Sequence, residues 1–175
     1  MTHVTVEVLD SLAYEAKVSP RRRQHRNLHA SAAEPCQRLL NAVWPDSYIR
    51  PHRHSAYKTP ECLLALRGTF ALLEFDADGE ILSVHRFGAG AELAIVEIPP
   101  DAWHTVLALT DGAVLFEAKS GPYSPGAAKT FAPWAPPEGS AGQAAYLAAL
   151  HRAASVGSDV HPPAQAVPRR QPGRC

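Results

Sequence analysis

The chain has 175 residues, and its 17 Lys and Arg residues balance its 17 Asp and Glu residues, so its formal net charge is zero. This length suits one domain with a proper core rather than two, and the balanced charge argues against a nucleic-acid-binding protein. Three widely spaced cysteines without a C-x-x-C pair indicate reduced thiols in a cytoplasmic protein, and we expect neither a signal peptide nor a membrane span, since no apolar run approaches about 18 residues.

The first 47 residues are predicted to form an extension that packs on a larger barrel. Residues 1–9 alternate valines with polar side chains, a pattern typical of a short strand. Asp10-Ser11 can then cap a short helix that ends near Lys17. Residues 34–43 suit a short helix or an irregular strand equally well, and the pattern does not separate the two.

A basic segment, Arg-Arg-Arg-Gln-His-Arg, occupies residues 21–26. It is either a solvated loop or a subsite for the phosphate of a sugar phosphate or nucleotide diphosphate, because a guanidinium group matches phosphate oxygens with two hydrogen bonds. Both interpretations remain open from the sequence.

Two histidines lie one residue apart, in Pro51-His52-Arg53-His54. Side chains alternate faces along an extended chain, so His52 and His54 are expected to point the same way. Glu61 begins the next apolar run, and His104 stands where a later turn enters another one. Imidazole nitrogens and carboxylate oxygens are ordinary ligands of divalent metal ions, so the four residues together predict a metal site. The alternative for the H-x-H pair alone is a solvated loop.

Apolar runs of strand length follow one another after Glu61. Turn residues separate them, as at Asp78-Gly79 and Asp111-Gly112. Strands are predicted over residues 61–66, 69–75, 80–87, 92–98, 103–109 and 113–119. Short strands at this spacing indicate an all-β sandwich or barrel, and a jelly-roll barrel would hide most strand edges around a central cavity.

The composition changes towards the end of the predicted barrel, which we place at residues 48–139. Residues 129–137 contain too much proline for a central strand, and Phe131 and Trp134 are expected to cover one end of the barrel. The alanine-rich segment 140–154 predicts a terminal helix, and the Pro-rich segment 155–175 predicts a disordered tail.

The candidate metal ligands resemble the motifs of the cupins. The first cupin motif has the form H-x-H, a short gap, E, six residues and G, and this chain has His52-x-His54, Glu61 and Gly68 with a longer gap. The second motif, P-x-G-x-x-H, corresponds to residues 99–104, with Asp101 where glycine is usual. The resemblance implies a cupin jelly-roll barrel that holds one divalent metal ion, with these ligands: His52, His54, Glu61 and His104.

A narrower resemblance covers roughly residues 10 to 150. The chain is similar to the small cupin metalloproteins found in O-antigen gene clusters, the WbuC type. The matching segments are residues 26–29, 37–38, 47–54, 58, 61, 103–105, 116–123 and 129–139. This resemblance implies a metal site, a connection to polysaccharide biosynthesis and, because cupins often pair through barrel edges, a homodimer. It implies no particular reaction.

Three imidazoles and one carboxylate leave about two open positions on a six-coordinate ion, and Fe, Mn, Ni, Co and Zn are all compatible. Such an ion can polarise a carbonyl, hold an enediolate or bind dioxygen. The first hypothesis is therefore isomerase, epimerase or lyase chemistry on a small, anionic and sugar-related molecule. The second is an Fe(II)-dependent dioxygenase, and the third is a non-catalytic, metal-dependent binding or sensor protein.

Positive and protic side chains beside the metal would hold an anionic substrate. Tyr123, as a general acid, and Lys58 are the candidate catalytic groups. The candidate substrate-binding residues are Arg50, Lys58, Lys119, Arg26 and His29. Glu117 shares a face with Lys119, so this pair can instead be a structural ion pair; the alternative for the other residues is solvation or hydrogen bonding in the core.

Overall fold

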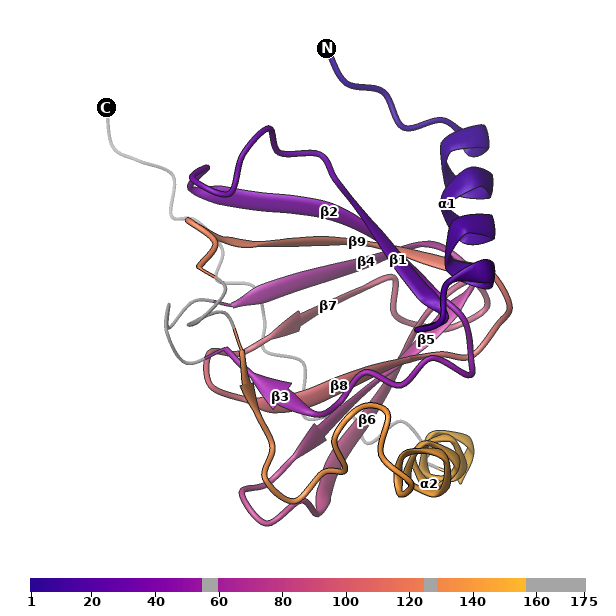
Figure 1. Cartoon of the computed structure of the whole chain (residues 1–175), viewed down its shortest axis with the longest axis vertical. Coiled ribbons are helices and arrows are strands. Elements are labelled where there is room, and N and C mark those ends of the chain that lie inside the picture. The colour runs from indigo at the N-terminus through magenta and orange to yellow at the C-terminus, as the bar shows by residue number, and fades with distance from the viewer. Residues whose placement is uncertain (55–59, 125–128, 157–175) are drawn as a thin grey trace, which may run out of the picture.

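The computed structural model describes residues 1–54, 60–124 and 129–156. Two five-stranded antiparallel sheets pack face to face, and a helix covers the outer face of each (Figure 1). Sheet A contains, in spatial order, β1 (Arg23–Asn27), β2 (Cys36–Val43), β9 (Ala113–Ser120), β4 (Glu61–Arg67) and β7 (Ile95–Ile98). Sheet B contains β10 (Thr130–Phe131), β3 (His52–Arg53), β8 (Trp103–Ala108), β5 (Thr69–Phe75) and β6 (Ile81–Gly88). The all-β jelly-roll prediction is confirmed.

An apolar core fills the space between the two sheets. Phe70 and Leu72 of β5 face this space, and the ring of Phe70 stacks on that of Phe87 at 5.4 Å. At one end of the sandwich, polar side chains take the inward positions that apolar ones hold elsewhere. A row of paired residues crosses sheet B there, from β3 to β6, and consists of His52, His104, Glu74 and Ser83. The fold therefore gathers polar side chains at one end of the interior.

Helix α1 (Val6–Val18) packs on the outer face of sheet A. The Thr5 hydroxyl accepts a hydrogen bond from the Val8 amide at 3.4 Å and caps the helix, and Leu12 and Ala16 are fully buried against β2. The strand predicted over residues 1–9 is therefore wrong. The spacing of the buried residues follows the helical period, and it outweighs the short valine alternation at the start.

Helix α2 (Gln143–Val156) packs on the outer face of sheet B. Leu147 and Leu150 lie against Leu73 and Leu107, and the helix lies at the bottom right of Figure 1. The predicted terminal helix is confirmed, with its start at Gln143 and its end at Val156. Of the tail predicted from residue 155, the part from residue 157 on lies outside the described residues.

Several elements differ from their sequence-based bounds. Residues 36–43 are a strand, which decides between the two alternatives for that segment. Residues 23–26 of the basic segment belong to β1 and so form a strand rather than a loop. β7 begins at Ile95 instead of residue 92, and β10 is a two-residue strand at the edge of sheet B.

No helix in the described part of the chain is long and apolar enough to cross a bilayer. The division into four segments at residues 47, 139 and 154 remains a prediction.

Candidate metal centre

Four polar side chains from both sheets meet at the polar end of the interior. His52 on β3 pairs directly with His104 on β8, His54 follows the end of β3, and one ring nitrogen of each histidine lies within 4.8 Å of the others. Glu61 begins β4 in the opposite sheet, and its Oε2 lies 3.0 Å from His54 Nε2 and 3.5 Å from His104 Nε2. The structure thus brings together all four residues that the sequence proposes as ligands.

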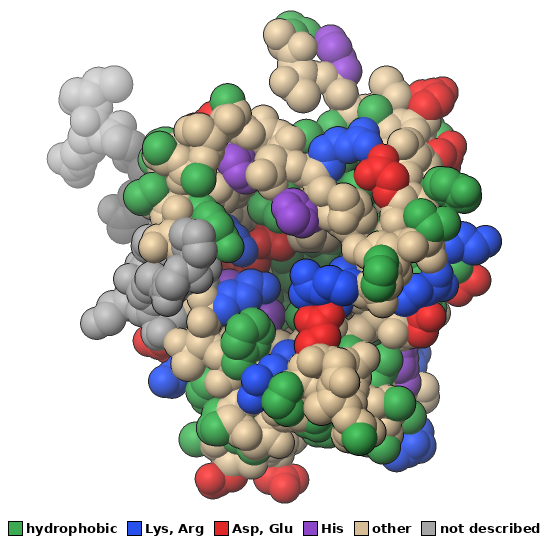
Figure 2. Space-filling view, viewed as in Figure 1, with side chains coloured by type: hydrophobic (Ala, Val, Ile, Leu, Met, Phe, Trp, Pro, Cys, Tyr) green, Lys and Arg blue, Asp and Glu red, His purple; other side chains and the backbone are tan. Residues whose placement is uncertain are grey.

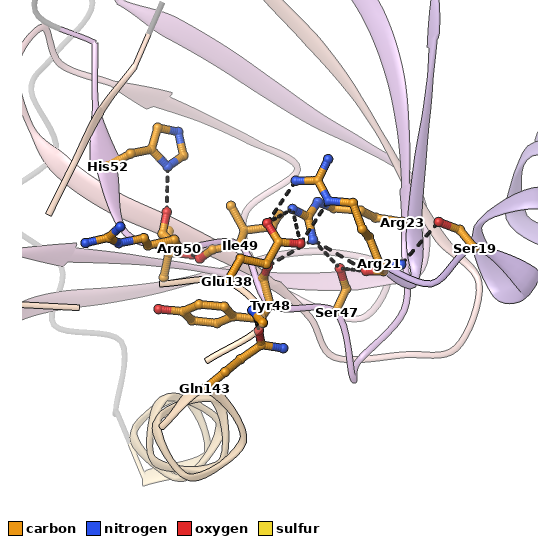
Figure 3. Close-up of polar contacts among 12 residues, drawn as sticks. Ser19, Arg21, Arg23, Ser47, Tyr48, Ile49, Arg50, His52, Glu138 and Gln143 are labelled. Carbon is orange, nitrogen blue, oxygen red and sulfur yellow. Dashed lines mark hydrogen bonds and ion pairs between the residues drawn. The ribbon is translucent and has the colours of Figure 1, made fainter. Parts of the chain in front are cut away.

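The local backbone fixes the orientation of two of the imidazole rings. His52 Nδ1 lies 3.0 Å from the carbonyl oxygen of Arg50, as Figure 3 shows, and His104 Nδ1 lies 2.9 Å from that of Ala102. A carbonyl oxygen can only accept, so each Nδ1 carries the proton and donates. Nε2 is then the ring atom left to bind an ion, as in metal sites whose ligating histidines are held by backbone carbonyls.

Burial and neighbouring charges set the protonation states at this site. His52, Glu61 and His104 are 4%, 7% and 2% exposed. Burial holds the pKa of His52 well below its usual value, so this imidazole is neutral near pH 7. Burial would raise the pKa of Glu61, but hydrogen bonds with His104 and His54 and the charge of Lys119 outweigh it and hold that pKa well below its usual range. A neutral imidazole and a carboxylate facing one point form a donor set that fits a divalent metal ion.

A network of charged side chains extends from Glu61 to Lys119 and Glu117 of β9. Lys119 Nζ lies 3.4 Å from Glu61 Oε1 and also forms an ion pair with Glu117, and Asn41 Nδ2 donates to Glu117 Oε2 at 2.6 Å. Burial and the charge of Glu61 raise the pKa of Glu117 to about 7. Burial alone would lower the pKa of Lys119, but the two carboxylates raise it above its usual value. Lys119 is therefore both beside the metal centre and part of an ion pair, which combines the two sequence-based alternatives.

The other proposed pocket residues have different surroundings. The Arg50 guanidinium donates to the carbonyl oxygen of Ala132 at 2.6 Å and lies over the Phe131 ring at 5.5 Å. Tyr123 is 46% exposed, and its backbone amide donates to the carbonyl oxygen of Ala32 at 2.7 Å. Lys58 lies outside the described residues. None of these observations tests the roles proposed for Arg50, Lys58 and Tyr123.

Arg26 and His29 lie in contacts away from the four candidate ligands. Arg26 pairs with Glu15 of α1 at 2.8 Å, on the outer face of sheet A. His29 Nδ1 accepts a hydrogen bond from the Arg38 amide at 3.0 Å, in the segment between β1 and β2. The described structure thus gives both side chains structural partners.

Arginines of the basic segment form ion pairs with acidic side chains of the same chain. Arg21 and Arg23 converge on Glu138, each with a shortest contact of 2.8 Å (Figure 3). Arg22 pairs with Asp46 at 2.8 Å. Burial would raise the pKa of Glu138, but hydrogen bonds from the two guanidinium groups outweigh it and lower the pKa to about 2. The first three arginines of the segment thus have acidic partners within the chain, and two of them share one carboxylate.

Four further polar residues were not predicted from the sequence to take part in the site, namely Glu74, Ser83, His85 and Lys129. Ser83 Oγ and His85 Nε2 both contact Glu74 Oε2, the latter at 3.2 Å, on the inward face of sheet B next to His104. Lys129 stands two residues before Phe131, whose ring lies 6.3 Å from that of His52. The strand alternation of β5 and β6 could have placed Glu74 and His85 inward, whereas nothing local marks Lys129.

Comparisons with known proteins support the architecture. A model of the family described as a domain of unknown function, DUF6016, matches residues 4–87. A search of curated protein sequences found no match. Among solved structures, oxalate oxidase in complex with the substrate analogue glycolate aligns with a TM-score of 0.50 at 14% identity, over 67% of this chain and 58% of that chain.

Two further structures give similar alignments. Protein SO0799 from Shewanella oneidensis aligns with a TM-score of 0.50 at 13% identity, over 61% of this chain and 72% of that chain. Oxalate decarboxylase aligns with a TM-score of 0.44 at 19% identity, over 57% of this chain and 26% of that chain, so the match spans about a quarter of that protein. At these identities the first two likenesses show the fold, which is the cupin jelly roll.

Proposed function

We propose that this cupin-fold protein binds one divalent transition metal ion through His52, His54, Glu61 and His104, and that it binds or transforms a small anionic molecule at that ion. The observation that carries the proposal is the convergence of three histidines and one carboxylate from opposite sheets, at mutual ligand-atom distances that one ion can bridge. Fe, Mn, Ni, Co and Zn are all compatible with this donor set.

The donor set supports a site with open coordination positions. When bound, the ion would supply Lewis-acid chemistry that polarises a carbonyl or hydroxyl oxygen of the ligand. The backbone carbonyls of Arg50 and Ala102 hold two imidazoles in the orientation such an ion needs. Lys119 lies beside Glu61 and would attract an acidic group of the ligand towards the ion.

The reaction that we favour is isomerase, epimerase or lyase chemistry on a sugar-related anion, in keeping with the resemblance to the WbuC type. Tyr123 and Lys58 remain our candidates for acid–base groups. The cupin-fold oxalate oxidase, whose structure contains glycolate, supports a small carboxylate as the kind of molecule that this architecture admits. A role in polysaccharide biosynthesis, a homodimer and a cytoplasmic location belong to the same proposal.

The favoured reaction and its two alternatives would use the same four metal ligands, but they differ in the effects that can be measured. An Fe(II)-dependent dioxygenase requires iron and takes up oxygen when its substrate is added. A metal-dependent isomerase tolerates several metals and exchanges solvent deuterium into its substrate. A sensor or binding protein shows neither effect and is only stabilised by its ligand. Oxygen-electrode and deuterium-exchange measurements on one protein preparation separate the three.

Elemental analysis of the purified protein tests the metal site directly. We expect about one divalent ion per chain in the wild type and a nearly metal-free double variant, His52→Ala with His104→Ala, because that variant keeps only half of the ligand set. His3→Ala removes an exposed histidine outside the site and should leave the metal content unchanged. Equal metal content in the wild type and the double variant would overturn the proposal.

A further inference from the structure

Lys129 is an exposed residue immediately before β10, the edge strand of sheet B. Phe131 pairs with His52 across the β10–β3 ladder, and its ring lies 6.3 Å from the imidazole. Side chains two residues apart in an extended chain leave it on the same side. Lys129 therefore extends from the chain on the side of His52, towards the charged side chains of sheet A.

The electrostatic surroundings of the Lys129 ammonium agree with this direction. Burial and the nearby charge of Lys119 lower the pKa of Lys129, while Glu117 and Glu61 act in the opposite sense. After burial, Lys129 is the charge that lowers the pKa of His52 most. The residue as a whole is exposed, so a ligand can reach it from solvent. Its charge nevertheless acts on His52, in keeping with the side of the chain from which it extends.

Lys129 differs from the neighbouring cations because no acidic group pairs with it. Lys119 contacts Glu117 and Glu61, and Arg23 contacts Glu138. Over residues 1–54, 60–124 and 129–156, Lys129 forms neither a hydrogen bond nor an ion pair. A cation that is reachable from solvent and has no acidic partner among the described residues is available to an anion supplied by a ligand.

The charges at this end of the interior indicate the class of that ligand. Lys119 and Lys129 together balance Glu61 and Glu117, so a divalent ion beside these four residues would leave two positive charges uncompensated. Figure 2 shows a hollow between the sheets, with Lys and Arg side chains at its rim and acidic and histidine side chains further in. A ligand with two negative groups would neutralise such a site.

We infer that Lys129, assisted by Lys119, forms an oxyanion subsite beside the metal centre. This subsite binds one acidic group of the ligand, a carboxylate or a phosphate. Other oxygen atoms of the same ligand would bind the ion. The ammonium groups donate charge-assisted hydrogen bonds to that group and orient the molecule across the interior. This inference rests on the proposed function and narrows its ligand from a small anion to a dianion.

The test uses the full chain loaded with Co(II) and three ligands that share a 2-hydroxycarboxylate head. Lactate carries no further charge, malate adds a carboxylate and 3-phosphoglycerate adds a phosphate, and affinities are measured by isothermal titration calorimetry. We expect malate or 3-phosphoglycerate to bind the wild type about tenfold more tightly than lactate, the effect of one hydrogen bond to a charged group. Whichever binds more tightly identifies the acidic group that the subsite prefers.

Variants of Lys129 connect the preference to this side chain. Lys129→Gln should abolish the preference for the dianion over lactate in protein that still takes up cobalt, whereas Lys129→Arg should keep most of that preference. Arg152→Gln removes an exposed cation of α2 and serves as the charge-matched control. An equal preference in the Lys129→Gln variant, or none in the wild type, would overturn the subsite. A wild-type protein that takes up no cobalt would instead overturn the proposed function, and the subsite with it.

Discussion

At the scale of single residues, Glu138 shows how charge is distributed in this molecule. It lies between the guanidinium groups of Arg21 and Arg23, 117 and 115 positions away in the sequence. The pair of contacts ties the segment after β10 to the start of β1. Such a contact leaves no local pattern, which is why the sequence analysis could read residues 21–26 only as a loop or a phosphate subsite.

The Glu138 contact predicts a specific pH dependence of stability. Its pKa is lowered to about 2 from 4.5, so the stabilisation is complete above about pH 4.5 and is lost as the pH falls towards 2. Glu138→Gln should cost about 1 kcal/mol at pH 7, a modest value because the pair is partly exposed. Urea denaturation of both proteins between pH 3 and pH 7 checks this. A difference that stays constant over that range would contradict the assignment.

The four candidate metal ligands differ from Glu138, because the relative positions of two of them follow from the local sequence. His52 and His54 are placed together by the two-residue period of an extended chain, and the positions of Glu61 and His104 could be added through the resemblance to cupin motifs. The narrower resemblance includes Lys129 in the segment 129–139 but gives it no role, because its place beside these residues depends on where the edge strand β10 joins sheet B.

At the scale of elements, α1 depends on a narrow apolar face. Leu12 is fully buried and packs with Leu40, Ala42 and Val114 on the outer face of sheet A. The sequence predicted a helix in this region but began it too late, since the valines of residues 1–9 fit both a strand and the first turn of a helix. The later strands were predicted more accurately because glycine turns separate them.

Leu12→Ala should therefore destabilise the protein through the cavity it leaves. We expect a loss of roughly 2–5 kcal/mol in the free energy of unfolding, the usual range for a large side chain removed from a core. Val6→Ala, at an exposed position of the same helix, should change stability little. Urea unfolding midpoints give both values. Equal midpoints for the two variants would show that α1 does not contribute to the cooperative core.

At the scale of the whole molecule, the candidate metal centre joins the two sheets. Glu61 comes from sheet A, whereas His52 and His104 come from sheet B. The sequence predicted the class of fold, because short strands with turn residues indicate a sandwich. It could not predict the strand order, because ladders such as β2–β9 join residues that are far apart in the chain.

Removal of the metal should therefore lower the melting temperature of the entire domain. A ligand at 100 times its Kd contributes about 2.7 kcal/mol, which corresponds to a shift of roughly 5–10 °C for a domain of this size. Thermal denaturation with and without a chelator measures the shift. The His52→Ala/His104→Ala variant is the control and should melt at the same temperature in both buffers. A wild type that is insensitive to the chelator would argue against an ion between the sheets.

The origin of the ligands in opposite sheets has a consequence for substrate entry. An ion held by these residues would connect Glu61 of sheet A with the imidazoles of sheet B. That ion would both bind the incoming molecule and influence the separation of the two sheets where the molecule enters. Loading with a larger or smaller ion should then change which molecules are admitted as well as how strongly they are activated.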